Sequence, residues 1–510
     1  MFPIDFFWRA AERWPDRIAV NGPEGALRFD ELAKRVAALS AGLLALDGES
    51  QSRVAICAGN SVDHITALLA VLACGKVWIP LNPKSTQREI RRIIDATEPS
   101  LVILDRSNDE LLEDGAAIRV YLGGGESSSD SPTTWGLIAA HAGAVPSTIN
   151  LDLGATQAIK FTGGTTGLPK GVKQTYRAWM ANIANQITIW GFNQDDRYVV
   201  AAPITHGTST YILPILAQGG CHLLPHRSGA EGVTATFRDG GGTVSFMPPT
   251  LIYMLMAHGE KSDFATLRRL IYGGSPMPIE KIRMAREFFG PVLCTTYGQT
   301  EAPQILTAMS PEDFEDPNNW GAVGRATWFN DVQIADPDGR LLPRGPVGEV
   351  VARGDLVMSG YWRLPHETES AIRNGWLHTG DRGHIDERGY LYLKDRLKDI
   401  VITGGFNVYP TDVESVLSEH PAVHESCVFG VPDDKWVETV QAGVQLRPGE
   451  HASEPELIAF VRERLGPVQT PKRIHFFDTL PTSPVGKVLK SQVKERVLAE
   501  LNNTNKESDS

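Results

Sequence analysis

The chain has 510 residues, of which 42% are hydrophobic and 22% are charged, with ordinary numbers of glycine and proline. This length exceeds what one hydrophobic core supports and suits about three or four units of typical domain size. The composition excludes collagen-like repeats and extended disorder. The formal net charge of −12 argues against a surface for nucleic acid or anionic membrane, because both need a broad basic patch. We therefore expect a globular, multi-domain protein with no nucleic-acid partner.

The cysteines and the amino-terminal residues indicate a cytoplasmic protein. The five cysteines are widely spaced and form no CxxC pair, so they predict neither a disulfide framework nor a zinc site. The first residues, MFPIDFFWRAAERWPD, place Asp5 and Arg9 where a signal peptide has an uninterrupted apolar run, so we expect an amphipathic packing helix. The most apolar run, ITALLAVLACGKVWIPL, is interrupted by Gly75, Lys76 and Pro80. It is typical of a buried helix that leads into a strand, which predicts no integral membrane contact.

From about residue 50 to 350, short β-rich apolar runs alternate with helical stretches, as in parallel sheets with helical crossovers. From 321 to 400, Gly and Asp turns separate short strands, which predicts a smaller antiparallel or barrel-like part. After residue 400 a new αβ pattern begins, and Thr411 with Glu414 predicts a capping box at a helix start. The expected strands are RVAIC, VWIPL, SLVIL, RYVVAAP, TVSFM, GEVVARG, GYLYLKD and DIVITGG, and the expected helices include SVDHITALLAVLA, PIEKIRMAREFF, ELIAFVRERLG and LKSQVKERVLAEL.

The segment FTGGTTGLPKGV combines four glycines with threonines and Lys170. Glycine permits positive φ and close approach of backbone N–H groups to a ligand, and the hydroxyls and the cation add donors, so the segment suits phosphates. A flexible surface connector is the alternative interpretation. The P-loop pattern GxxxxGK[ST] does not fit, because counting from Gly163 reaches Leu168 and counting from Gly164 reaches Pro169.

This segment resembles the signature of the AMP-forming acyl-adenylating superfamily, which includes acyl-CoA synthetases, peptide-synthetase adenylation domains and luciferases. Further stretches resemble the same family in the same order and cover most of the chain from about residue 50 to 490. Gly163 stands where the family commonly has serine, which leaves the backbone cradle intact. The further stretches are LACGKVWIPLNP (72–83), YGGSP (272–276), TYGQTE (296–301), WLHTGDRGHIDERGYLYLKDRLKDIVITGGFNVYPTDVE (376–414) and PVGKVLK (484–490).

The resemblance, which is strongest to acyl-CoA synthetases, implies an α/β fold with two domains. The amino-terminal domain, residues 1–397, would hold two doubly wound sheets and a small β-barrel part, and would bind ATP and the acid. A smaller, mobile α+β domain, residues 398–510, would carry a catalytic lysine, with the hinge near Lys398. In this superfamily the small domain rotates between the adenylation and the thiol-transfer states.

The resemblance also implies a reaction. In the superfamily a carboxylate attacks the α-phosphorus of ATP, pyrophosphate leaves, and a thiol, usually that of coenzyme A, attacks the acyl-adenylate. A carboxylic acid is already ionised at neutral pH, so the reaction needs cations and donors near the phosphates, without a catalytic triad. The expected cofactors are ATP, Mg²⁺ and coenzyme A.

The resemblance assigns the phosphate contacts to two motifs. Thr300 would contact the α-phosphate, and Glu301 would bind the Mg²⁺ that bridges phosphate oxygens. A Thr-Glu pair after a strand is otherwise a routine helix start. The residues implied for the β- and γ-phosphates are Thr162, Gly164, Thr165, Thr166 and Lys170.

The nucleoside contacts come from three other stretches. Tyr297 would stack on adenine, although without the resemblance it is expected in the core. Asp381 would accept hydrogen bonds from the ribose hydroxyls, and Arg396 would add a second polar contact; both would otherwise be solvated turn residues. The loop along the base edge would contain Gly273, Gly274 and Ser275.

The carboxyl-terminal residues would serve both half-reactions. Lys487 fits the family lysine that bridges the attacking carboxylate and the phosphate. After rotation, Gly404 and Gly405 would replace it beside the adenylate and leave space for the pantetheine arm of coenzyme A. Trp436 would line the tunnel that holds this pantetheine arm, or would simply pack in the core of the small domain.

The acid would lie beside His206, which by resemblance closes behind its carboxylate, although a lone histidine is more often structural. Small residues follow His206, and Phe246 and Met247 are the expected apolar walls. Amino-acid-activating relatives carry an aspartate in this region, and none occurs between His206 and Leu216. The expected substrate is an apolar monocarboxylic acid, either a medium- to long-chain fatty acid or an aromatic (benzoate-like) carboxylate.

Two alternatives stay open at this point. A stand-alone adenylating enzyme would load a carrier protein or stop at the adenylate. A regulatory nucleotide-binding protein with an inactive site is disfavoured, because loss of at least one functional residue is expected in such a protein. The sequence also leaves a homodimer open. The functional residues that are all present are Lys170, Glu301, Asp381, Arg396 and Lys487.

Overall fold

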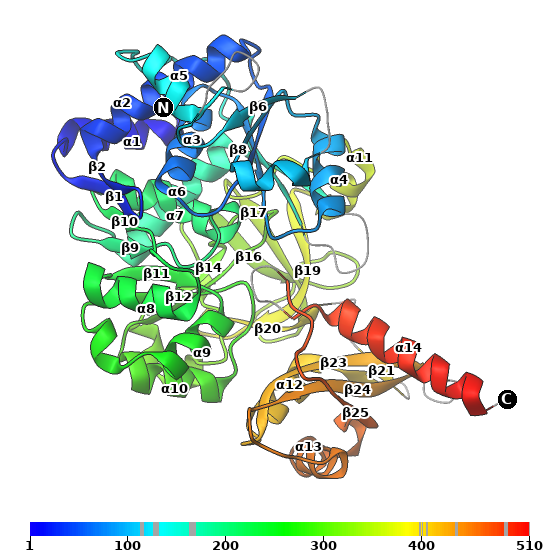
Figure 1. Ribbon diagram of the computed structural model, residues 1–510. Helices are drawn as coiled ribbons and strands as arrows, with labels where there is room; N and C mark the ends of the chain where they lie inside the picture. Colours follow the sequence, from blue (N-terminus) through cyan, green and yellow to red (C-terminus); the bar gives the residue numbers. More distant parts are fainter. Residues whose placement is uncertain are drawn as a thin grey trace.

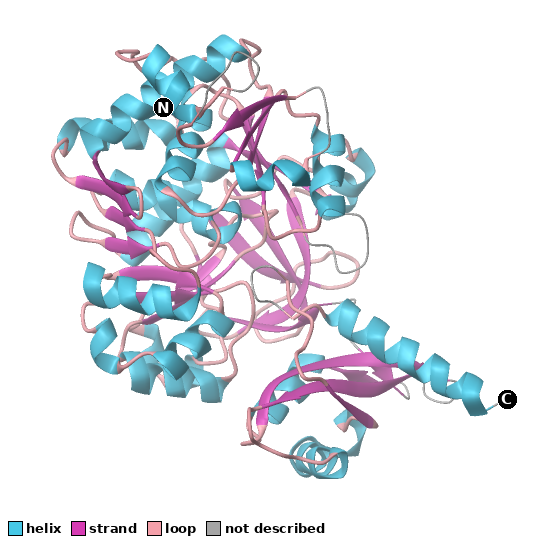
Figure 2. Ribbon diagram, in the orientation of Figure 1, coloured by secondary structure: helices cyan, strands magenta, loops and turns pink. Residues whose placement is uncertain are grey.

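The computed structural model describes residues 1–112, 117–125, 132–162, 170–396, 399, 401–403, 406–433, 437–483 and 488–508. Two large sheets with helices packed around them form the upper part of the molecule (Figures 1 and 2). A small sheet with its own helices forms the lower part, and the final helix α14 extends to the side (Figure 1). The α/β class predicted from the sequence is confirmed.

The first large sheet has six strands in the order β6-β5-β3-β4-β7-β8. Its strands are parallel except β8, which is antiparallel to β7. All five residues of β4 are buried, as expected for a parallel strand with helices on both faces. The bounds are β3 (Arg53–Cys57), β4 (Val77–Leu81), β5 (Leu101–Leu104), β6 (Ile118–Tyr121), β7 (Thr156–Phe161) and β8 (Gly171–Thr175).

The second large sheet has nine strands in the order β15-β14-β13-β12-β11-β9-β10-β1-β2. Its centre is parallel, and antiparallel strands lie at both edges. The bounds are β1 (Ile18–Gly22), β2 (Gly25–Arg28), β9 (Arg197–Val199), β10 (Cys221–Leu223), β11 (Val244–Met247), β12 (Arg269–Tyr272), β13 (Leu293–Tyr297), β14 (Thr307–Met309) and β15 (Arg325–Ala326).

The two large sheets share one hydrophobic core. Trp78 from the first sheet and Tyr198 from the second belong to the same buried cluster, together with residues of α1, α3 and α7. The expected amphipathic helix at the amino terminus is α1. The helices of this region are α1 (Pro3–Arg13), α2 (Phe29–Leu46), α3 (Val62–Ala73), α4 (Gln87–Thr97), α5 (Thr134–Ala140), α6 (Tyr176–Trp190), α7 (Ser209–Ala217), α8 (Gly229–Gly240), α9 (Pro249–His258), α10 (Ile279–Phe289) and α11 (Pro365–Ala371), with short helical turns η1 (Arg106–Leu111), η2 (Ile204–Thr208), η3 (Lys261–Phe264), η4 (Asp313–Glu315) and η5 (Pro317–Asn319).

A third, antiparallel sheet follows in the chain, as the glycine- and aspartate-rich texture predicted. Its order is β16-β17-β19-β18, and β20 pairs with β19. In that last pair Asp381 stands directly opposite Arg396. The bounds are β16 (Asn330–Ala335), β17 (Gly348–Gly354), β18 (Ile372–Arg373), β19 (Trp376–Ile385) and β20 (Leu391–Arg396).

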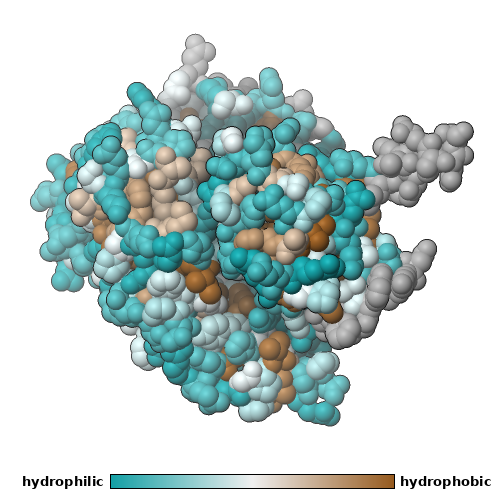
Figure 3. All heavy atoms as spheres, turned by 90° about the horizontal axis from the view of Figure 1, so that it is seen from below, coloured by the Kyte–Doolittle hydropathy of each residue, from teal (hydrophilic) through white to brown (hydrophobic). Residues whose placement is uncertain are grey.

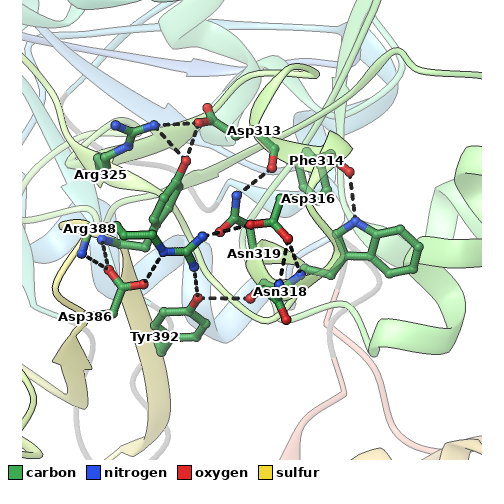
Figure 4. A network of polar contacts seen from close by, with 11 residues as sticks. Asp313, Phe314, Asp316, Asn318, Asn319, Arg325, Asp386, Arg388 and Tyr392 are labelled. Carbon is green, nitrogen blue, oxygen red and sulfur yellow. Dashed lines mark hydrogen bonds and ion pairs between the residues drawn. The ribbon is translucent and has the colours of Figure 1, made fainter.

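A polar network joins the third sheet to the η4–η5 segment (Figure 4). Asp313 accepts hydrogen bonds from Tyr390 at 2.5 Å and from Arg325 at 2.8 Å. Arg388, in the turn between β19 and β20, contacts Asp316 at 2.8 Å. These contacts fix the turn before β20, the strand that carries Arg396.

The carboxyl-terminal region has its own sheet, in the order β22-β21-β24-β23 with β25 beside β24, and its own buried core. One expectation about it is wrong: α12 begins at Pro410 with Tyr409 in the capping position, so Thr411 is not the N-cap. Proline at the first helical position has φ preset for the helix. The domain boundary at residue 398 stays a prediction. The bounds are β21 (Val401–Thr403), β22 (Phe406–Val408), α12 (Pro410–Ser418), β23 (Val423–Asp433), β24 (Val437–Leu446), α13 (Glu454–Gln469), β25 (Arg473–Phe476) and α14 (Lys490–Ser508).

The surface viewed from below shows several separate apolar areas among hydrophilic side chains (Figure 3). Across the molecule, the exposed apolar side chains belong to different elements, including Trp135 of α5, Met254 of α9 and Ile279 of α10. No described helix combines the length and the apolar character that crossing a membrane requires.

Candidate active site

The predicted site residues gather where central strands of the two large sheets end. Thr162 directly follows β7, Gly273 follows β12, and Thr300 lies three residues beyond β13. Ligands of open α/β sheets bind outside the carboxyl ends of parallel strands. In each case a strand is followed directly by a polar loop. These loops, which are far apart in sequence, therefore lie at the carboxyl ends of the parallel strands.

The glycine-rich segment connects two antiparallel strands, β7 and β8. Its two ends face each other, because the backbone N–H of Thr162 donates to the carbonyl of Lys170 at 3.1 Å. Residues Gly164, Thr165 and Thr166 lie outside the described residues, so their implied phosphate contacts stay predictions.

Tyr361 links the glycine-rich segment to the TYGQTE motif. Its hydroxyl donates to Oε1 of Glu301 at 2.8 Å, and the Lys170 ammonium lies 5.0 Å from the centre of its ring. Burial and the adjacent Glu301 carboxylate raise the pKa of Tyr361 above its ordinary value, so the phenol stays a hydrogen-bond donor at neutral pH. Sequence reasoning missed Tyr361, because nothing in its local pattern indicates a partner 60 residues away.

The segment after β13 is an irregular loop, whereas a helix start was the alternative interpretation of the Thr-Glu pair. The carbonyl of Thr300 accepts a hydrogen bond from the Gln174 side chain at 2.9 Å. The carbonyl of Glu301 accepts one from the Met358 N–H at 2.8 Å. Both residues are half-buried, so their side chains border open space while their backbone is held.

The predicted adenine and ribose residues lie together. The hydroxyl of Tyr297 donates to Oδ2 of Asp381 at 2.7 Å, and Gln299 donates to the same oxygen at 2.6 Å. Asp381 is 7% exposed, and the backbone of Arg396 stands opposite it, although the Arg396 side chain lies outside the described part. Gln299 was not predicted from the sequence.

The GGS loop borders this group of residues. Gly274 has φ of +82°, and a Cβ there would meet no atom within 4 Å, so its backbone lies against open space. A Cβ on Gly273 would come within 2.8 Å of the Thr296 carbonyl. Only glycine allows this close approach. Ser275 follows and is half-buried.

His206 lies in η2, the turn that precedes α7. The backbone of His206 is non-helical there, with φ −115° and ψ −140°, and the imidazole is exposed to open space. Surrounding protein atoms and the nearby Lys160 lower the pKa of His206, an effect that water at the exposed ring partly offsets. The neutral imidazole is therefore the form at pH 7.

The expected apolar walls divide between two faces of β11. Phe246 lies beside Gly207, where an added Cβ would come within 3.0 Å of its ring and 2.8 Å of the Gln304 side-chain oxygen. Met247 is fully buried in the separate core under α8 to α10, so its prediction as a wall is wrong. Alternate residues of a strand point to opposite faces, which places only Phe246 next to His206.

Behind Phe246, three aromatic rings are stacked in a row. The Phe246 and Tyr211 rings are 5.2 Å apart at 19°, and the Tyr211 and Tyr198 rings are 5.5 Å apart at 20°. Both tyrosines are fully buried. The Gln304 amide donates to the Tyr211 hydroxyl at 3.2 Å. The space next to His206 is therefore bordered at Gly207 by the Phe246 ring and the Gln304 side chain, and the two buried tyrosine rings lie behind Phe246.

The remaining predicted residues lie outside the described part of the chain, and their roles stay predictions. The donor set that is described fits ATP with Mg²⁺: a carboxylate at the ribose position, a lysine with a carboxylate at the phosphate position, and glycine backbone facing open space. In the described ranges no three His, Cys, Asp or Glu side chains form a metal site, and Mg²⁺ beside nucleotides needs only one or two protein carboxylates. The residues outside the described part are Lys398, Gly404, Gly405, Trp436 and Lys487.

Comparisons with known proteins agree with this site. The medium/long-chain-fatty-acid–CoA ligase FadD8 of Mycobacterium tuberculosis is 36% identical over 347 residues, which are 66% of this chain and 61% of that protein. The feruloyl-CoA synthase of an Amycolatopsis species is 32% identical over 498 residues, 96% of this chain and 97% of that protein. The solved structure of the amide bond synthetase McbA from Marinactinospora thermotolerans has a TM-score of 0.87 at 31% identity, with 97% of this chain and 99% of that one covered.

Two family models also match. The model for AMP-binding enzymes covers residues 7–362, and the model for the AMP-binding enzyme C-terminal domain covers residues 412–487. The first match includes most of the strands that carry the site, and the second lies within the separate carboxyl-terminal region. The chain therefore belongs to the AMP-binding enzyme family.

Proposed function

We propose that this chain is an AMP-forming acid–CoA ligase that activates an apolar monocarboxylic acid. The observation that carries the proposal is the contact of Tyr361 with both Lys170 and Glu301. It unites a cation from the glycine-rich segment with a carboxylate from the TYGQTE motif. This is the arrangement required to hold a triphosphate with its magnesium ion.

Family membership confirms the expectation of an AMP-forming ligase that uses ATP, Mg²⁺ and coenzyme A. When bound, Mg²⁺ neutralises charge on the phosphate oxygens. In our proposal Glu301 holds that ion, Lys170 binds the outer phosphates, and Asp381 accepts the ribose hydroxyls. Neutral His206 lies against the acid without adding charge, and Lys487 approaches from the small domain during adenylation. We propose that the enzyme acts in the cytoplasm, the location that the sequence analysis predicted.

The acid class is the finer part of the proposal. The sequence favoured a medium- to long-chain fatty acid and left an aromatic acid open, and the similarity to FadD8 and to feruloyl-CoA synthase supports one class each. The ring stack of Phe246, Tyr211 and Tyr198 closes the space behind Gly207. A compact acid fits such a wall better than an extended chain, so we favour an aromatic acid and keep the fatty acid as the second candidate.

A pyrophosphate-release assay over straight-chain acids of increasing length and a set of aromatic acids, with and without coenzyme A, tests the proposal. We expect release with aromatic acids, and loss of at least 100-fold in Glu301→Gln, which keeps the side-chain size. No release with any acid would overturn the ligase proposal. Release that peaks with long straight chains would reverse the preference for aromatic acids.

Coenzyme A dependence separates the ligase from the remaining alternative. A ligase releases AMP and a thioester in multiple turnovers only with coenzyme A. An enzyme that loads a carrier protein would release pyrophosphate once per site and leave coenzyme A unchanged.

A further inference from the structure

Lys160 is a buried amine at the carboxyl end of β7. It is 7% exposed, and its Nζ lies 4.9 Å from the ring centre of Trp78 and 5.6 Å from that of Trp179. Among the described residues no carboxylate pairs with it. A buried charge without a counter-charge is expensive, so its presence beside the site calls for a role.

The amine is bonded to the turn that presents His206. Nζ of Lys160 donates to Oγ of Ser209 at 2.7 Å and to the carbonyl of His206 at 3.3 Å. The Ser209 hydroxyl donates to the same carbonyl at 2.7 Å. These three groups form a closed set of hydrogen bonds.

The non-helical backbone at His206 explains why this set is needed. In a regular helix the carbonyl of residue 206 would accept the N–H of residue 210. At the break, the His206 carbonyl instead accepts the backbone N–H and the hydroxyl of Ser209 together with the Lys160 ammonium. The amine of Lys160 therefore helps to hold the turn and to orient the imidazole that it carries into the open space.

Among the described residues, the neighbouring titratable side chains other than His206 interact little with the charge of Lys160. Lys173, on the neighbouring strand, pairs with Ile159 and so lies on the opposite face from Lys160. Arg177 of α6 is exposed, and Tyr211 of α7 is bonded to Gln304. The hydroxyl of Tyr176 is buried and has no hydrogen-bond partner in the part of the chain that the structure describes. Burial alone lowers the pKa of Lys160 to about 7, and His206 is the titratable group whose pKa it affects.

We propose that Lys160 is a positioning residue for the acid: its ammonium fixes the His206 turn and supplies a buried positive charge beneath the site of the anionic substrate. This proposal rests on the proposed function. An anion bound beyond His206 stabilises the protonated amine, so acid binding and proton uptake at Lys160 are coupled. Acid affinity then declines as the amine loses its proton.

ATP–pyrophosphate exchange between pH 6 and 9 tests the proposal, because this half-reaction omits the coenzyme A thiol. Cinnamate and decanoate are the probe acids, one from each candidate class. In the wild type we expect kcat/KM for the acid to fall by about tenfold in total between pH 7 and pH 9, as the amine loses its proton, and then to level off at the value of the neutral amine. In Lys160→Met we expect about a tenfold loss at pH 7, in KM rather than kcat, and no such decline with pH.

The KM for ATP should change by less than about twofold in Lys160→Met, whereas a misfolded site would impair both substrates. Lys173→Met is the matched control, because it removes a lysine from the neighbouring strand on the opposite face, and it should keep the wild-type pH profile. A wild-type kcat/KM that is flat between pH 7 and 9 would overturn the proposal, and so would an unchanged decline in Lys160→Met. Absence of exchange with every acid would instead overturn the proposed function.

A measurement without turnover follows the amine itself. Since Trp78 and Trp179 flank Nζ, protonation of Lys160 should change the intrinsic tryptophan fluorescence, with an inflection near pH 7 in the wild type and none in Lys160→Met. Saturating decanoate or, should exchange identify the aromatic class, benzoate should move the inflection upward by at least half a pH unit. An inflection that persists in Lys160→Met, or that neither acid moves, would contradict the coupling.

Discussion

At the scale of single residues, Lys160 places a charge near the acid but lowers the stability of the folded protein. Burial lowers its pKa from 10.5 to about 7, so between these pH values the unfolded chain binds more protons than the folded one. The wild type therefore gains stability as pH rises through this window. Lys160→Met does not titrate, so its advantage in stability over the wild type should be largest at or below pH 7, about 5 kcal/mol, and should shrink towards pH 10.

Urea denaturation at pH 7 and pH 9.5 measures this difference. Lys173→Met serves again as the control, because it removes a lysine from the neighbouring strand on the opposite face. A stability difference for Lys160→Met that does not change with pH would show that the buried amine does not titrate in this range.

Asp381 is the residue on which nucleotide affinity should depend most. Its carboxylate accepts hydrogen bonds from Tyr297 and Gln299, and asparagine would replace part of that acceptor capacity with a donor. Hydrogen bonds to charged groups contribute about 1.5–3 kcal/mol, so Asp381→Asn should raise the KM for ATP by roughly 10- to 100-fold.

Titration of AMP by calorimetry checks the same change without turnover. Tyr297→Phe keeps the ring and loses only the hydroxyl, so its effect on ATP should be smaller, within about fivefold. If Asp381→Asn changed the KM for the acid more than the KM for ATP, the assignment of Asp381 to the ribose would be wrong.

At the scale of elements, the network around Asp313 holds the β19–β20 turn to η4. Burial opposes ionisation of Asp313, but hydrogen bonds from Tyr390, the Ser310 N–H and Arg325 overcome it and lower the pKa. A carboxylate with a lowered pKa adds stability above its unfolded pKa and loses it in acid. Asp313→Asn should therefore destabilise the protein by about 2 kcal/mol at pH 7.

Thermal unfolding at pH 7 and near pH 3 tests this expectation, and the difference between variant and wild type should narrow at the lower pH. Asp338→Asn is a suitable control, since the ion pair of Asp338 with Arg340 is largely exposed on a turn and such a pair contributes little. An equal effect of both substitutions would mean that the junction in Figure 4 is no more stabilising than a surface pair.

The sequence predicted the elements well where periodicity was strong. Buried β-branched runs identified β3, β4, β5 and β11, because parallel strands covered on both faces leave few polar positions. The helix start at Thr411 was wrong because proline at position 410 competes with a capping residue one step later and begins the helix itself.

Residues of the site could be predicted from the sequence only where they lie in a motif that resembles the family. Motifs gave Tyr297, Asp381 and Glu301, and the structure brings their segments to one edge. Tyr361 and Lys160 were not found, because their importance comes from contacts between segments far apart in the sequence. Gln299 lies within the TYGQTE motif but was given no role, because its contact with Asp381 joins residues 82 positions apart. The prediction of Met247 as a wall of the acid site was wrong, because the sequence does not show which face of β11 lies towards that site.

At the scale of the whole molecule, the predicted rotation of the small domain separates the two half-reactions. Lys487→Ala should lower adenylation by at least 100-fold, since an ammonium between carboxylate and phosphate would be lost. It should leave thioester formation from preformed acyl-AMP within about threefold of the wild type. Single-turnover assays of each step measure this, and equal losses in both would contradict domain alternation.

Lys398→Pro tests the hinge independently. Proline fixes φ near −65°, so a rotation that uses this position should be hindered. We expect the second half-reaction to slow by more than tenfold while pyrophosphate exchange changes by less than about threefold. Lys394→Pro would be a poor control because Lys394 lies within β20, so Lys398→Ala, which removes the same side chain without fixing φ, serves instead. A similar loss in both steps would place the pivot elsewhere.

The row formed by Phe246, Tyr211 and Tyr198 has a consequence for redesign of the enzyme. Trimming Phe246 alone would expose a second ring and its hydroxyl, so the cavity would grow by one side chain and then stop. Acceptance of a longer acid would require shortening all three rings together, with apolar replacement of Gln304, whose amide would otherwise lose its partner. Selection from libraries that vary these four positions jointly should succeed where single-site variation reaches a plateau.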